Sequence, residues 1–225
     1  LKKTVAGSLV IGFLSSLCIT LAGLVGLHPL LVLLDTPAEI LEEAYSYILI
    51  IDVGVLVMFA YNLCAGLLRA IGNSFMPLVF LLISSGLNVA LDLVFIAVVG
   101  MGVKGAAVAT VISQGVSVVL CIFYVLRKTR VLVPERKHFQ VGRKLYWDLF
   151  SQSISMGLMS SIVSAGSVVL QYGINGLGTL VIAGHTAARK MFAFTDMPLI
   201  AMANAGSTFV SQNYGANHPD RVRKG

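Results

Sequence analysis

The stretch that decides the fold is Met76 to Val99, MPLVFLLISSGLNVALDLVFIAVV. A helix needs about 20 mainly apolar residues, at about 1.5 Å each, to cross the hydrocarbon core of a bilayer, and this run is long enough. It nevertheless contains a carboxylate, Asp92, with Asn88 one helical turn before it. A charge at that depth is costly without a partner or a wet cavity, and such residues mark ion or substrate pathways. The run therefore predicts a membrane helix with a coupling site at Asp92.

The composition of the whole chain agrees with a membrane protein. Hydrophobic residues make up 57% of it and charged residues only 12%, with a mean hydropathy of +0.89. Soluble domains carry about 25% charged residues, so a soluble fold is excluded. Cys18, Cys64 and Cys121 each fall in a different apolar stretch, which favours packing over a redox or metal role.

Apolar stretches long enough to span occur six times. We place them at residues 5–34, 40–68, 76–99, 105–126, 148–175 and 180–212. Turn or charge signals separate them, such as Asp35-Thr36-Pro37, Gly100-Met101-Gly102 and Gly176-Leu177-Gly178. We therefore expect an all-α polytopic membrane protein with six helices present.

The basic residues indicate which way these spans point. If the connections alternate between the two sides, one side holds Lys2, Lys3, Arg69, Arg127, Lys128, Arg130, Arg136, Lys137, Arg143, Lys144, Arg221, Arg223 and Lys224. The other side holds Lys104 together with the acidic first loop. Cytoplasmic loops carry the excess of Lys and Arg, so both ends are expected in the cytoplasm.

The segment 127–147 is the one long polar stretch and carries much of this positive charge. It lacks the aromatic interleaving and the basic helix face typical of nucleic-acid binding. We interpret it as a cytoplasmic linker whose basic residues lie near anionic lipid headgroups, and expect no nucleic-acid partner.

Three polar residues are expected to meet inside the membrane. Asn88 and Asp92 are four residues apart and share a helix face. Asp92 precedes Met101, the centre of the next turn, by as many residues as Thr110 follows it, so Thr110 can reach the level of Asp92. Carboxylate, amide and hydroxyl oxygens suit a hard cation such as Na⁺, and the carboxylate alone suffices for H⁺. The alternative is a structural hydrogen-bond cluster that ties the two helices together.

Other polar residues in the spans give weaker signals. Asn62 lies deep in the second span and is open to either a structural or a coupling role. Gln171 and Asn175 share one face of the fifth span and could contact a substrate or a neighbouring helix. No HExxH, GxSxG, phosphate loop or clustered His and Cys spacing is present in the sequence, so we expect a non-enzyme without cofactor.

Four runs resemble the multidrug and toxic compound extrusion (MATE) family. GLLRAIGNS at 66–74 resembles the end of that family's fourth helix, and NVALD at 88–92 its fifth. GVKGAAVAT at 102–110 is similar to the opening of the sixth helix, and SQNYGA at 211–216 to the end of the eighth. The resemblance covers essentially the whole chain, in order.

This resemblance implies two helical lobes of a twelve-helix transporter, related as repeats. Residues 1–126 would be helices three to six of the N-lobe, 127–147 the cytoplasmic linker, and 148–225 the first two helices of the C-lobe. A start at Leu1 and a stop at Gly225 would then be cuts through a longer protein, without helices one, two and nine to twelve.

The resemblance also implies a cation-coupling site in the N-lobe. Asp92, Asn88 and Thr110 fall on it, with Asn62 as a less certain member from helix four. Some branches of the family carry a glutamate in helix seven, but residues 148–175 contain none. Coupling through the N-lobe is therefore expected, by Na⁺ or H⁺, with no other metal.

The function implied is export of organic or amphipathic drugs by alternating access, from a bacterial plasma membrane and by a protein that is monomeric when whole. The alternative is a flippase for lipid-linked oligosaccharide or polysaccharide of the same superfamily. That alternative needs an interior rich in Arg and Lys, and apart from Arg189 and Lys190 the spans have none. Asp196, on the same helix, can compensate that charge locally.

Overall fold

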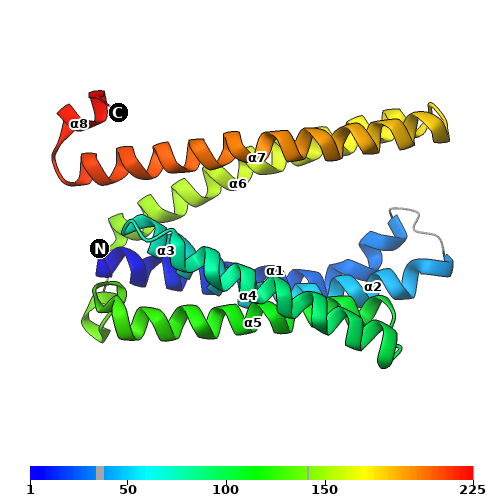
Figure 1. Ribbon diagram of the computed structural model, residues 1–225, viewed down its shortest axis with the longest axis horizontal. Helices are drawn as coiled ribbons and strands as arrows, with labels where there is room; N and C mark the ends of the chain where they lie inside the picture. The colour runs from blue at the N-terminus through cyan, green and yellow to red at the C-terminus, as the bar shows by residue number, and fades with distance from the viewer. Residues whose placement is uncertain (34–37, 141, 225) are drawn as a thin grey trace. The chain divides into compact units, whose positions relative to one another are not determined.

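The computed structural model describes residues 1–33, 38–140 and 142–224, and every regular element among them is helical (Figure 1). The predicted turn at 35–37 lies outside these residues. The chain divides into two units, Leu1–Tyr146 and Trp147–Gly225. The elements in chain order are α1 (Lys2–Leu33), α2 (Ala38–Val53), α3 (Val55–Ala70), α4 (Phe75–Asp92), η1 (Leu93–Val98), α5 (Val103–Lys128), η2 (Arg130–Leu132), η3 (Arg136–Phe139), α6 (Arg143–Asn175), α7 (Thr179–Gly215) and α8 (Pro219–Lys224).

Five of the six predicted spans are long and apolar enough to cross a membrane within the described residues. Four are the stretches Lys2–Leu33, Phe75–Val98, Val103–Lys128 and Arg143–Ile174, and the bent pair α2–α3 is the fifth. The predicted sixth span is also a helix, α7, with 37 residues. This helix is not among the stretches that are apolar enough, and it carries Arg189, Lys190 and Asp196. The fold is that of an all-α polytopic membrane protein.

The second span is not the single straight helix that the sequence predicts over 40–68. It bends by 45° between α2 and α3, at Gly54. The side chain of Val111 from α5 fills the space beside Gly54, where an added Cβ would lie 2.5 Å from Val111 Cγ2. A glycine therefore lets α5 approach the bend, because an added Cβ would displace the Val111 side chain or one of the helices.

Helices α4 and α5 form an antiparallel hairpin (Figure 1). Small residues and hydroxyl groups hold the two helices together. Every fourth residue of α5 is small and buried along one face: Gly105, Ala109, Ser113 and Ser117. Ser84 Oγ of α4 donates to the backbone oxygen of Ser113 at 2.9 Å, and Ser117 Oγ donates to that of Phe80 at 3.0 Å. Small residues let membrane helices approach closely, and such interhelical bonds average about 0.6 kcal/mol each. These contacts fix the register in which the polar residues of the two helices meet.

Most of the basic segment 127–147, which the sequence predicts to be a linker, belongs to the first unit and packs against α1. Both η2 and η3 contact α1. Leu132 of η2 is 1% exposed and joins a core of Tyr61, Ala65, Leu68, Phe80 and Cys121. Full burial of a leucine side chain contributes about 1.5–3 kcal/mol. This part of the segment is therefore held in place by apolar packing.

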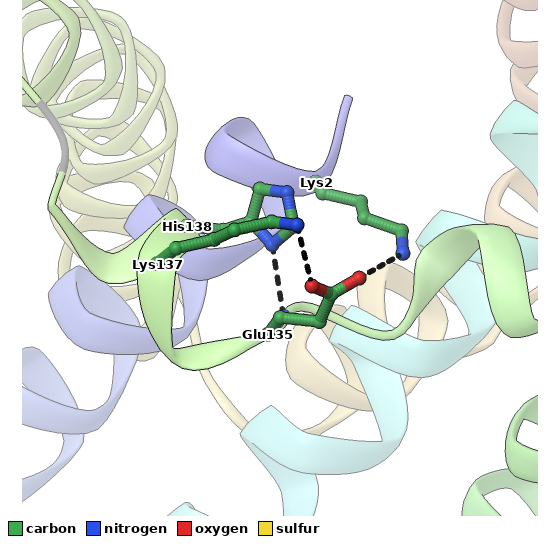
Figure 2. A network of polar contacts seen from close by, with 4 residues as sticks. All are labelled: Lys2, Glu135, Lys137 and His138. Carbon is green, nitrogen blue, oxygen red and sulfur yellow. Dashed lines mark hydrogen bonds and ion pairs between the residues drawn. The ribbon is translucent and has the colours of Figure 1, made fainter.

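An acidic residue ties the basic segment to the start of α1 (Figure 2). The Glu135 carboxylate lies between two ammonium groups, 2.8 Å from Lys137 Nζ and 3.1 Å from Lys2 Nζ. The Glu135 backbone N–H donates to His138 Nδ1 at 2.9 Å. Hydrogen bonds from Lys137 and then Lys2 lower the pKa of Glu135 to about 2. The carboxylate is therefore ionised at neutral pH and joins two segments that are far apart in sequence.

The second unit consists mainly of α6 and α7, joined at the predicted turn Gly176–Gly178. Gly178 has a φ of 92°, in the left-handed region that favours glycine. Helix α7 continues through Pro198 without a break. Large apolar side chains such as Val169 and Phe192 are 72% exposed. Such faces are stable against lipid or other apolar helices, as expected for a membrane protein.

Candidate cation-coupling site

The candidate site lies where α4 ends. Helix α4 is continuous from Phe75 to Asp92, so Asn88 and Asp92 lie on one face, and both are half-buried. The winding then changes, because residues Leu93–Val98 form a π-helix. The N–H of Val99 donates to the backbone oxygen of Val94 at 2.9 Å, a spacing of five residues. Short π-helical segments inside helices occur frequently at functional sites.

Thr110 of α5 meets Asn88 of α4, one turn before Asp92. Asn88 Nδ2 lies 3.5 Å from Thr110 Oγ1, a long hydrogen bond. Thr110 Oγ1 in turn donates to the backbone oxygen of Ala106 at 2.9 Å. The hydroxyl oxygen therefore keeps lone-pair capacity on the side of α4.

The position of Thr110 corrects the register predicted from the sequence, which placed it at the level of Asp92. The predicted turn is present, with Gly100 at φ 72° and Gly102 at φ 58°. The π-helix between Asp92 and this turn has wider windings and so rises less per residue than an α-helix. Asp92 is therefore closer to the turn than an α-helical count gives, and Asn88 is the residue that faces Thr110.

One carboxylate oxygen of Asp92, Oδ1, is buried without a hydrogen-bond donor among the described residues. A buried carboxylate oxygen without a donor is costly, and in apolar surroundings the group is neutralised by a proton or a cation. Asn88 precedes Asp92 by one turn of α4 and contacts Thr110, and carboxylate, amide and hydroxyl oxygens are the ligands that a hard cation prefers. The residues present therefore fit a proton or an alkali cation.

A transition-metal centre has no basis in the part of the chain that the structure describes. No three His, Cys, Asp or Glu side chains gather there as ligands. The chemistry of the Asp92 cluster is one carboxylate with neutral oxygen donors.

Asn62 is not brought into this cluster. It is exposed on α3, and its Nδ2 donates to the backbone oxygen of Met58 at 2.8 Å, within the same helix. The sequence signal for Asn62 was depth in a span, which does not specify the direction in which a side chain points.

The two candidate substrate residues lie at the α6–α7 turn of the second unit. Gln171 is half-buried and lines a pocket of about 340 Å³ with Thr186, Arg189, Lys190 and Ala193. The side chain of Asn175 lies outside the described part of the structure. The expected local compensation by Asp196 is absent, since neither Arg189 nor Lys190 forms an ion pair among the described residues. The two cations face a pocket instead of their own helix.

The family model MatE matches residues 1–94 and 155–224. The chain belongs to the MatE family. It is 32% identical over 197 residues to "Probable multidrug resistance protein YpnP" of Bacillus subtilis (strain 168), covering 86% of this chain and 43% of that protein. It is 24% identical to "Probable multidrug resistance protein YoeA" of the same organism, over 100% of this chain and 50% of that protein. The fold resembles "Crystal structure of MATE in the straight conformation" with a TM-score of 0.89 and 24% identity, over 99% of this chain and 50% of that one.

These comparisons confirm the family suggested by the four sequence runs. The MatE-family chain spans about half the length of the curated relatives it matches. Its helical fold agrees with half of a solved MATE structure. The feature that sequence reasoning missed is the π-helix after Asp92, because the run LVFIAV is equally apolar for either winding.

Proposed function

We propose that the intact protein is a cation-coupled antiporter that exports organic or amphipathic drugs. The observation that carries this proposal is Asp92, whose Oδ1 is buried in a membrane helix without a hydrogen-bond donor among the described residues. The relatives named multidrug resistance proteins support export as the transport reaction. Membership of the MatE family argues against an enzyme.

Coupling requires that the ion prefer one of two facing states of the transporter, because an ion that binds both equally drives nothing. Asp92 supplies the charge that takes up Na⁺ or H⁺, and Asn88 with Thr110 supplies neutral oxygens beside it. Binding of the ion neutralises the carboxylate and so favours the state in which this part of α4 is closed from water. Drug release and ion entry then alternate across the membrane.

The remaining parts of the proposal follow from the charge distribution and the family. Both ends of the chain lie in the cytoplasm of a bacterium, with the basic segment 127–147 on the cytoplasmic side. The protein is embedded in the plasma membrane and works as a monomer. Gln171 and Asn175 lie near the substrate cavity. The flippase alternative has no support from the relatives, which are named for multidrug resistance.

The experiment that tests the proposal is drug efflux from proteoliposomes of the intact protein under an imposed Na⁺ or H⁺ gradient. Asp92→Asn keeps the size and most hydrogen bonds of the side chain but removes the titratable charge. We expect it to abolish gradient-driven export while drug binding survives, and Asn88→Ala to weaken export less. Asp148→Asn at the start of α6 makes the same chemical change away from the cluster and should export normally. Wild-type export by Asp92→Asn under both gradients would place the coupling site elsewhere.

A further inference from the structure

A second carboxylate belongs to Asp52, a half-buried residue at the interface of α1 and α2. It lies two residues before Gly54, where the second span bends. Its carboxylate packs directly against Gly23 of α1, and a Cβ added to Gly23 would lie 2.1 Å from Asp52 Oδ2 and 2.8 Å from Oδ1. The contact depends on a glycine in α1. We call this position of the Asp52 carboxylate against Gly23 its seat.

The seat provides no hydrogen-bond donor for one of the carboxylate oxygens. Asp52 Oδ2 is buried and has no hydrogen-bond partner among the described residues. The nearby hydroxyl of Thr20 donates to the backbone oxygen of Asp52 at 3.0 Å instead. An ionised carboxylate in this seat would hold an uncompensated charge in an apolar surrounding, whereas a protonated one holds none.

The helices around Asp52 offer no cation to pair with it. The Lys and Arg residues of α1, α2, α3 and α5 lie in the end turns of those helices. Two other titratable side chains of the α1–α2 interface, His28 and Tyr45, contact each other edge to face, with ring centroids 5.5 Å apart. On the α5 side, the groove beside α2 is lined by apolar residues, including Val108 and Val111. A proton is therefore the ligand that the surroundings of Asp52 allow.

Asp52 lies at nearly the same level as the Asp92 cluster, along α5. Gly54 packs on Val111, and Asn88 bonds to the adjacent Thr110. At about 1.5 Å per residue, Asp52 and Asp92 are displaced from these two contacts by roughly 3 and 6 Å toward the same end of the bundle. The two carboxylates therefore differ in level by less than one helical turn, but they belong to different interfaces.

We propose that Asp52 is a second proton-binding residue of the first unit, protonated while it is seated against Gly23 and ionised when α2 separates from α1. Proton loss leaves a charge that needs water, and the bend at Gly54 is the place where α2 can move away from α1 to admit it. The proton leaves Oδ2 to solvent and no covalent bond other than O–H changes. Because Asp52 lies outside the Asp92 cluster, this proposal does not depend on whether Asp92 couples transport.

Infrared spectra of the intact protein in proteoliposomes test the proposal, with the spectrum of each variant compared with that of the wild type. The probe is the C=O stretch of a neutral carboxylic acid, recorded near neutral pH. We expect the wild-type protein and Asp92→Asn to show a band that Asp52→Asn lacks. Gly23→Ala places a methyl group in the seat and should weaken the same band. Gly26→Ala is the matched control on the same helix, because a Cβ there meets nothing within 4 Å, and it should leave the band intact.

Three outcomes would overturn the proposal. The first is a spectrum of Asp52→Asn that equals the wild type. The second is a band lost in Asp92→Asn alone, which would assign the neutral acid to Asp92 and leave the coupling proposal standing. The third is an equal band in Gly23→Ala and Gly26→Ala, which decides the matter even if Asp52→Asn fails to fold.

Discussion

Replacing Thr110 separates a role in ion binding from a role in holding α4 to α5. Thr110→Val keeps the shape of the side chain but removes the oxygen, whereas Thr110→Ser keeps the oxygen. For folding, the loss concerns one long bond to Asn88 at 3.5 Å and one bond to the backbone oxygen of Ala106. The interhelical bond contributes about 0.6 kcal/mol, less than a threefold change in the folding equilibrium.

For ion binding, the expected cost is larger because the partner of the oxygen is charged. Interactions of a polar group with a charged one contribute about 1.5–3 kcal/mol, and 1.4 kcal/mol is a factor of about ten in affinity. We therefore expect Thr110→Val to raise the cation concentration for half-maximal efflux by about tenfold or more, while Thr110→Ser stays near wild type. The assay is initial efflux rate from proteoliposomes against cation concentration, with thermal unfolding in detergent measured in parallel.

Two results would refute this reasoning. If Thr110→Val shows the wild-type half-maximal concentration, the hydroxyl does not act on the ion, and the Asn88–Thr110 contact is a structural bond. If Thr110→Ser is impaired as much as Thr110→Val, the shape of the side chain matters and its oxygen does not.

Three further predictions concern packing, pH and topology. Leu132→Ala should lower the free energy of unfolding by about 2–5 kcal/mol, because Leu132 is 1% exposed in the core, whereas Val131→Ala, at a residue 53% exposed, should change it little in a denaturation series. Because the pKa of Glu135 is lowered to about 2 from its usual 4.5, its ion pairs stabilise the protein above about pH 4.5 and are lost as the pH falls through 2. The difference in melting temperature between wild type and Glu135→Gln should therefore shrink over that range, and a constant difference down to pH 2 would contradict it. A cysteine placed at Gly178 should react with an impermeant reagent from outside the cell and one at Glu135 only from the cytoplasm, so labelling of the latter from outside would reverse the orientation.

The helical fold was predictable because apolar length and turn signals are local properties of the sequence. A run such as 76–99 must satisfy its backbone hydrogen bonds within itself in lipid, so it must be helical. The turn at Gly100–Gly102 was predictable for a similar reason, because two nearby glycines are a local turn signal. Both glycines adopt a positive φ in the structure. The bend at Gly54 was not, because the packing around it involves Val111, which is far away in sequence.

The candidate site was predictable in part. A carboxylate in an apolar run identifies Asp92 by its energetic cost alone, and the spacing of four puts Asn88 beside it. The exact partner of Thr110 was not predictable, since the π-helix after Asp92 changes the rise per residue without changing the hydropathy. Asn62 shows the same limit, because depth in a span does not tell which neighbour a side chain faces.

The sequence by itself determined that this chain is a helical membrane protein of the MatE family with a costly carboxylate at Asp92. These properties depend on composition and on residues close to one another in the chain. Only the tertiary structure decided which polar groups are partnered, since that depends on the register and approach of separate helices. Among the described residues, Asp92 Oδ1 and Asp52 Oδ2 have no hydrogen-bond partner, and neither fact can be read from the residues that neighbour them in sequence.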